Sequence, residues 1–324
     1  MQWDFDKMAA TMKNVSFTLI CALSCFVLLT ASAQAAGLWL FEQGTPDLGA
    51  AAAGRAAMAK DASTAFGNPA GMTRLKDSQL TVGAQTLFPQ IKFNADDSSF
   101  GGGSGGSAGV LISPREGTRF GIQYRSKVDL EYEDKPDLSG VGPLLQAALN
   151  LTGLAGSNVK LDMELPQAVL ASAYHEFTDK LAIMGNVGWQ NWSSFGNIDV
   201  SINSDTSTSA TQDLGYDDTW HFALGGQYRI AKPWLLSIGA AYDTSPADSA
   251  KKRTPAMPFD RQYRLAAGLQ YELNPDVTLG AAYQYLDLGD ANINRTGGLL
   301  RGDLKGKYKK NEIHFLGVNL ICKF

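Results

Sequence analysis

The chain has 324 residues, a formal net charge of −4 and a mean hydropathy of −0.13. Beyond the N-terminus no run approaches the roughly 20 apolar residues that a membrane-spanning helix requires, which argues against a helical membrane protein. The chain also lacks a basic domain, so its charge gives no case for a nucleic-acid partner.

Residues 1–35 are predicted to be a secretory signal peptide. Lys13 lies in a short polar region, residues 15–30 are almost wholly apolar, and Ala33-Gln34-Ala35 is an A-x-A cleavage site. The mature chain is therefore expected to begin at Ala36. Since two of the three cysteines lie in this leader, the mature chain keeps one, which forms neither a disulfide framework nor a metal cluster.

Residues 36–78 are rich in alanine and glycine and show no alternating pattern. Residues 38–41 (LWLF) are nevertheless apolar, which is not typical of a disordered tail. A small-residue segment that packs inside something narrow accounts for both features. Within it, Pro69 lacks an N–H donor and favours an extended Asn68, whose side chain can then bond the backbone nearby.

From residue 79 onward the chain reads as β-strands with one apolar and one polar face. The clearest example is residues 262–273, which alternate without exception. Small and polar residues occupy the face that would be the core of a soluble sandwich, so the apolar face is predicted to contact lipid. The apolar set is Tyr263, Leu265, Ala267, Leu269, Tyr271 and Leu273, and the other set is Gln262, Arg264, Ala266, Gly268, Gln270 and Glu272.

The pattern predicts ten strands, three of them long and unbroken at 119–133, 160–177 and 181–199. The fold class is therefore all-β, a transmembrane antiparallel β-barrel over residues 79–324. Connections alternate between long and short, which places the short turns and both termini in the periplasm. The long connections are 94–99, 134–159, 200–218, 244–261 and 286–304, and the short ones are 114–118, 178–180, 231–233 and 274–276.

The segment AGLWLFEQ, followed by LGAAAAGRAAMAKDASTAFGNPAGM, resembles the N-terminal hatch of the FadL/TodX family of outer-membrane transporters. Asp61, Asn68, Pro69 and Ala70 correspond to the hatch motif. The resemblance continues in YRSKVDLEYE, in LPQAVLASAYHEFTDKLAIMGNVGWQNWSSF and in YDTSPADSAKKRTPAMPFDRQYRLAAGLQYEL. It implies a hatch at 36–78, a location in the outer membrane of a Gram-negative bacterium, and transport of long-chain fatty acids or other hydrophobic compounds. Larger members have fourteen strands, and four of those after the first have no equivalent here.

Two groups of residues are candidates for ligand contact. In the connection 134–159, the apolar side chains share one helical face, which either packs on the loop itself or forms a landing groove for a hydrophobic molecule. Around the connection 244–261, guanidinium groups either contact lipopolysaccharide and solvent or pair with a carboxylate headgroup. The groove candidates are Leu144, Leu145, Ala148, Leu149 and Leu151, and the headgroup candidates are Arg253, Arg261 and Arg264.

The sequence predicts a passive channel rather than an enzyme. The three histidines show no metal-ligand spacing, and none has an obvious serine beside it. We expect a monomer that has no cofactor, is surrounded by outer-membrane lipid and lipopolysaccharide, and takes up a hydrophobic ligand. The alternative is a structural or surface-binding barrel with a closed lumen, whose interior charges Arg125, Lys127, Asp129 and Glu131 would pair. A continuous apolar pocket would favour transport.

Overall fold

The computed structural model describes nine stretches of the chain, all within one compact unit, Trp39–Phe324. The predicted signal peptide and the predicted apolar groove at 141–154 lie outside these stretches. The described residues are 45–90, 107–134, 158–195, 197–203, 208–254, 257, 259–296, 303–308 and 310–324.

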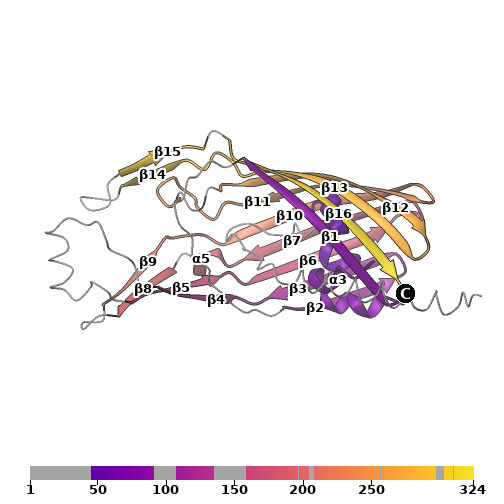
Figure 1. The fold of residues 1–324 in the computed structure, drawn as a ribbon, viewed down its shortest axis with the longest axis horizontal. Helices are drawn as coiled ribbons and strands as arrows, with labels where there is room; N and C mark the ends of the chain where they lie inside the picture. Colours follow the sequence, from indigo (N-terminus) through magenta and orange to yellow (C-terminus); the bar gives the residue numbers. More distant parts are fainter. Residues whose placement is uncertain are drawn as a thin grey trace, which may run out of the picture. The chain divides into compact units, whose positions relative to one another are not determined.

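A ten-stranded antiparallel sheet dominates the fold, in agreement with the ten strands predicted (Figure 1). Neighbours in the chain are mostly neighbours in the sheet, as short hairpin turns require. In sheet order the strands are β1 (Gln79–Gln90), β16 (Glu312–Lys323), β13 (Val277–Asp287), β12 (Gln262–Asn274), β11 (Trp234–Asp243), β10 (Thr219–Ala231), β7 (Leu181–Gln190), β6 (Ala168–Glu176), β3 (Thr118–Arg125) and β2 (Ser107–Arg115).

The predicted inversion of the two faces is confirmed. On β12, Tyr263 and Leu265 are 48% and 60% exposed, whereas Arg264 between them is 1% exposed. The same alternation appears on β10, where Trp220 is exposed and His221 is buried. Because large apolar side chains point outward and small or polar ones inward, the sheet is built to meet lipid on its outer face.

The inner face packs against four short helices of the hatch: η1 (Pro46–Ala50), α2 (Arg55–Met58), α3 (Thr64–Gly67) and η2 (Pro69–Arg74). Helix η1 contacts β10, β11, β12 and β13, and α2 contacts β2, β3 and β6. Since strands far apart in the sheet touch one short segment with the same face, the sheet curves around the hatch. Among the described helices, none has the length and apolar character needed to cross a membrane.

The three long unbroken strands were predicted wrongly. Each is divided, and the outer pieces β4 (Val128–Asp134), β5 (Asn158–Leu165) and β8 (Asn197–Asn203) form a separate sheet with β9 (Thr208–Asp213). Pro166 separates β5 from β6, where it can donate no ladder hydrogen bond. A short helix, α5 (Trp192–Phe195), separates β7 from β8.

The predicted connections and interior charges are corrected as well. The connection 200–218 contains β9, and the connection 286–304 contains β14 (Ile293–Thr296) and the start of β15 (Asp303–Gly306), which pair as a hairpin. Lys127, just before β4, and Asp129, on β4, were predicted to line the interior. Their side chains are 51% and 65% exposed, and they pair with each other at 3.3 Å beside the separate sheet. They leave the charge pairing of the interior to other residues.

The strands at the two ends of the sheet order, β1 and β2, share no pairing among the described residues. They are joined by residues 91–106, which lie outside the described stretches. Helix η2 of the hatch lies against β2. At this edge of the ten-stranded sheet, β2 therefore contacts helix η2 of the hatch instead of a further described strand.

Candidate functional site

The hatch approaches the wall closely because glycines on the strands face it. A Cβ atom at Gly225 of β10 would lie 2.9 Å from the Cβ of Ala53, and one at Gly268 of β12 would lie 2.9 Å from the Cα of Gly49. One added to Gly239 of β11 would overlap the carbonyl of Ala50. Small inward residues therefore make room for a backbone rather than for a side-chain core.

Asn68 ties the hatch to the free edge strand of the sheet. Its backbone is extended, as predicted, and its Oδ1 accepts from the N–H of Ala70 at 3.1 Å. Its Nδ2 donates to the carbonyl of Ala56 at 2.8 Å and to that of Val110, on β2, at 3.0 Å. The bond to Ala70 was predicted from the sequence. The bond to Val110 on β2 was not, because an alternating pattern does not indicate which residue 42 positions away lies nearby.

A second anchor comes from polar side chains on β6 and β7. Asn186 accepts from the N–H of Gly54 at 2.8 Å and donates to the carbonyl of Ala52 at 2.6 Å. Ser172 donates to Asn186 and accepts from the N–H of Ala56 at 3.1 Å. Neither residue was predicted as a contact of the hatch, although the inward parity of both indicates that their side chains need partners.

The remaining hatch-motif residue, Asp61, is 7% exposed and accepts from the N–H of Ser63 at 2.9 Å. Burial raises the pKa of its carboxyl above the usual range, and the bonds to Ser63 oppose this. Elsewhere in the hatch, Arg55 lies 3.5 Å from Asp47, with both side chains buried. These contacts make the hatch a folded unit rather than a tail.

The three predicted headgroup arginines do not converge on one site. Arg264 is buried and forms an ion pair with Asp243, which also lies 2.5 Å from His221 Nδ1. Arg253 lies 2.7 Å from Asp260 and donates to the carbonyl of Ala247 at 3.1 Å. Arg261 is exposed, and only its backbone N–H bonds Asp260. Each guanidinium that is buried here already has a carboxylate partner.

An apolar cluster lies beyond the ends of β7 and β10 that carry the long connections. Trp192 and Phe195 of α5 meet edge to face with ring centroids 5.0 Å apart, and Phe195 stacks on Tyr216 at 6.5 Å. The Tyr216 hydroxyl lies 3.5 Å from the sulfur of Met257, and both residues are buried. Sequence analysis missed this aromatic cluster because it assigned its members to a strand and to connections.

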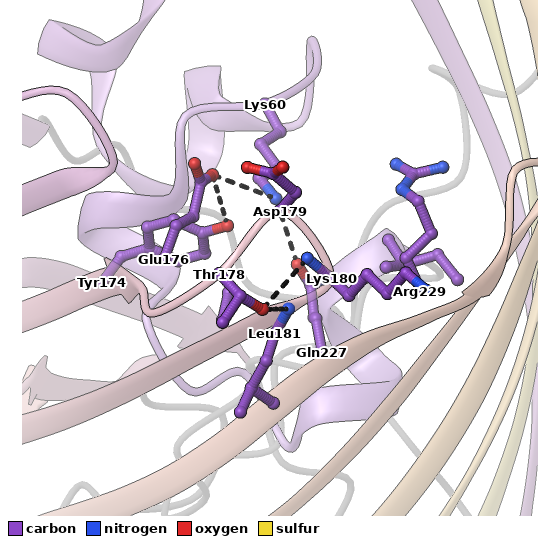
Figure 2. A pocket seen from close by; sticks show the side chains of 11 residues that line it. Lys60, Tyr174, Glu176, Thr178, Asp179, Lys180, Leu181, Gln227 and Arg229 are labelled. Carbon is purple, nitrogen blue, oxygen red and sulfur yellow. Dashed lines mark hydrogen bonds and ion pairs between the residues drawn. The ribbon is translucent and has the colours of Figure 1, made fainter.

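At the opposite end, where the short turns lie, the hatch and the wall enclose a polar pocket of about 130 Å³ (Figure 2). Lys60 of the hatch reaches into it, 3.8 Å from Glu176 and 3.3 Å from the amide oxygen of Gln227. Tyr174 lies beneath the ammonium, with its ring centroid 4.8 Å away. The other lining residues are Thr178, Asp179, Lys180, Leu181, Ala182, Arg229 and Leu235. Within the described stretches, no group of three acidic, cysteine or histidine residues could hold a metal ion.

Comparison with known proteins gives consistent matches. A family model described as outer membrane protein transport protein (OMPP1/FadL/TodX) matches residues 26–104 and 101–324. A long-chain fatty acid transport protein of Escherichia coli O6:H1 is 32% identical over 216 residues, which is 64% of this chain and 47% of that protein. Outer membrane protein P1 of Haemophilus influenzae is 29% identical over 184 residues, 57% of this chain and 38% of that protein. The chain thus spans about half the length of the curated relatives it matches, or less.

Two solved structures share the fold. A Pseudomonas aeruginosa FadL homologue superimposes with a TM-score of 0.58 at 20% identity, over 76% of this chain and 62% of that one. The CymD monoaromatic hydrocarbon channel superimposes with a TM-score of 0.51 at 14% identity, over 86% of this chain and 97% of that one. At these identities the likeness concerns the fold alone, and it agrees with the predicted all-β barrel class.

Proposed function

This chain belongs to the outer membrane protein transport protein (OMPP1/FadL/TodX) family of Gram-negative outer membranes, and we propose that it is a channel for passive uptake of hydrophobic small molecules. The candidate ligands are long-chain fatty acids and aromatic hydrocarbons, the compounds named for its relatives. The observation that carries the proposal is the way the hatch is held. It packs on the inner face of the sheet through small residues and a few hydrogen bonds.

Small contact residues lower the free energy needed to displace the hatch from the sheet. The buried contact consists mainly of alanines, among them Ala50, Ala53 and Ala57. A side chain contributes about 0.8 kcal/mol per buried CH₂, so alanine contacts hold the hatch less tightly than leucine or phenylalanine contacts would. Displacing the hatch therefore costs less free energy than displacing an ordinary core helix.

Backbone strain adds to this. Ala51, Ala52 and Ala59 have φ angles of 51°, 57° and 44°. An L-residue in this left-handed region costs about 1–2 kcal/mol, and such strain persists only where the surroundings enforce it. The hatch therefore stores free energy in its closed arrangement, which favours movement when a ligand disturbs its contacts.

We propose a path of three stages. The ligand is captured at the long-connection end, where the predicted groove residues Leu144, Leu145, Ala148, Leu149 and Leu151 supply apolar surface. It then reaches the hatch, and a shift of the hatch opens the way. The β1–β2 edge supports a sideways exit, because η2 of the hatch lies against β2 there and the hatch residues Phe66 and Met72 are 64% and 51% exposed rather than buried. An apolar molecule that leaves beside them avoids water.

The experiment is ligand binding to the purified protein, folded in detergent, with oleate and toluene as probes. Saturable binding of at least one probe is expected. Arg253, Arg261 and Arg264 remain the proposed headgroup ligands, and a loss of oleate binding in Arg253→Ala or Arg261→Ala, with toluene binding unchanged, would support that role. If neither probe binds saturably, the channel proposal is wrong and a structural barrel with a closed lumen takes its place.

A further inference from the structure

The lining of the pocket at the short-turn end carries three cations, Lys60, Lys180 and Arg229, and two carboxylates, Glu176 and Asp179. Glu176 lies 3.8 Å from Lys60 and also 3.8 Å from Arg119, so two cations share one carboxylate. Arg229 has its own partner, Glu272, at 2.8 Å. The remaining two charged lining residues, Asp179 and Lys180, carry opposite signs.

The two contacts of Glu176 with these cations are loose. At 3.8 Å they exceed hydrogen-bond length, and the close partner of Glu176 is the hydroxyl of Tyr174, which donates to it at 2.8 Å. The guanidinium of Arg119 meanwhile lies over the ring of Tyr174 and donates to the carbonyl of Ala57. Arg119 and Glu176 are therefore held by contacts within the sheet and the hatch, whereas no carboxylate of the described residues lies within hydrogen-bond distance of the Lys60 ammonium.

Lys60 is the residue that reaches from the hatch into the pocket, and its side chain is 36% exposed. Burial lowers the pKa of its ammonium to about 8; Glu176 and Asp61 oppose this fall, and Arg119 and Arg229 add to it. An additional anion beside the ammonium would offset the desolvation that burial imposes. A carboxylate at hydrogen-bond distance, which none of the described residues supplies, would therefore stabilise the charged form of Lys60.

We propose that Lys60 receives the carboxylate of an apolar acid at this end of the lumen, in place of its loose contact with Glu176. The proposal rests on the proposed uptake function and narrows the ligand class to hydrophobic monocarboxylates. The pocket volume of about 130 Å³ is several times what one water molecule requires. It admits the carboxylate and adjoining carbons, and the apolar residues of its lining are Leu181, Ala182 and Leu235.

The test follows acetylation of Lys60 by mass spectrometry in the full chain, with oleate and its uncharged methyl ester as probes. Oleate is expected to slow acetylation of Lys60, and methyl oleate is expected not to. Lys76, an exposed lysine at the end of the same hatch and outside the pocket, is the internal control and should react at one rate throughout.

Binding measurements on variants give an independent readout. Lys60→Met should weaken oleate binding about tenfold, the effect expected for the loss of one charge-assisted hydrogen bond, without changing methyl oleate binding. Glu176→Gln removes the carboxylate that competes with the ligand for Lys60, so it should strengthen oleate binding. A variant that only loosened the hatch would weaken oleate binding instead. Raising the pH from 7 to 9.5 should weaken oleate binding in the wild type but not in Lys60→Met, because Lys60 loses its charge over this range.

The outcomes separate the two proposals. If oleate and methyl oleate both bind saturably but neither Lys60 acetylation nor the variants distinguish them, the carboxylate site is wrong and the channel proposal stands. If Glu176→Gln weakens oleate and methyl oleate alike, Lys60 and Glu176 only fasten the hatch, which also overturns the site. If neither probe binds saturably to the wild type, both proposals are wrong.

Discussion

At the scale of the residue, Asn68 fastens the hatch to the wall with one side chain. Asn68→Ala removes the bonds to Ala56, Ala70 and Val110 and leaves buried groups without partners, at a cost of about 1–3 kcal/mol. We expect faster hydrogen exchange in residues 45–74, while the ten-stranded sheet stays protected. Thr73→Ala, which removes one exposed hydroxyl bond in the same hatch, is the matched control. Equal exchange in both variants would contradict this role of Asn68.

A second residue-scale prediction concerns the buried ion pair of Arg264 and Asp243. Replacing either partner alone breaks the ion pair and leaves the other charge in a site that is 1% exposed, which typically costs about 3–5 kcal/mol, although His221 still contacts Asp243. The double variant Arg264→Gln, Asp243→Asn should cost less than the sum of the single variants. Urea unfolding followed by tryptophan fluorescence measures the three free energies, and strictly additive losses would show that the pair is not coupled.

At the scale of the element, the hatch and β11 meet backbone to backbone. Gly239→Ala places a methyl group against the carbonyl of Ala50, so the hatch must shift. Gly226→Ala on neighbouring β10 is the control, because its nearest contact is a carbonyl 3.7 Å away. We expect single-channel conductance in planar bilayers to rise in Gly239→Ala alone. An unchanged conductance would mean that the hatch does not limit passage.

Asp218, which precedes β10, positions helix α5 by accepting hydrogen bonds from Trp189, Asn191 and Ser193. Burial raises the pKa of this carboxyl, but the hydrogen bonds from Ser193, Asn191 and Trp189 outweigh burial and lower it. Because the folded pKa is depressed, its stabilisation is present above the ordinary value, about 4, and is lost as the pH falls through the folded value. Exchange at residues 191–195 should therefore rise below about pH 4. Asp218→Asn should remove this dependence, and its persistence would contradict the assignment.

At the scale of the whole molecule, the alternation of apolar and polar residues correctly predicted the strands of the ten-stranded sheet, whose outer face meets lipid. It did not predict where the chain leaves that sheet to form the separate one. Phe120, Ile122 and Tyr124 share even parity with Val128 and Leu130, so the alternation passes over the break after Arg125 without a signal. Ser172 and Asn186 were not singled out from the sequence, because their hatch partners depend on how the sheet curves. The pocket at Lys60 joins residues 60, 176 and 227, which no local pattern connects.

The most direct test of the uptake function is oleate or toluene uptake by cells that lack their own outer-membrane channel for the compound and express this chain. The account predicts saturable uptake without added energy source, above that of cells without the chain. Gly239→Ala should alter its rate, and Gly226→Ala, at equal surface level, should not. Uptake of both compounds equal to that of cells without the chain, with the protein folded in the outer membrane, would contradict the account.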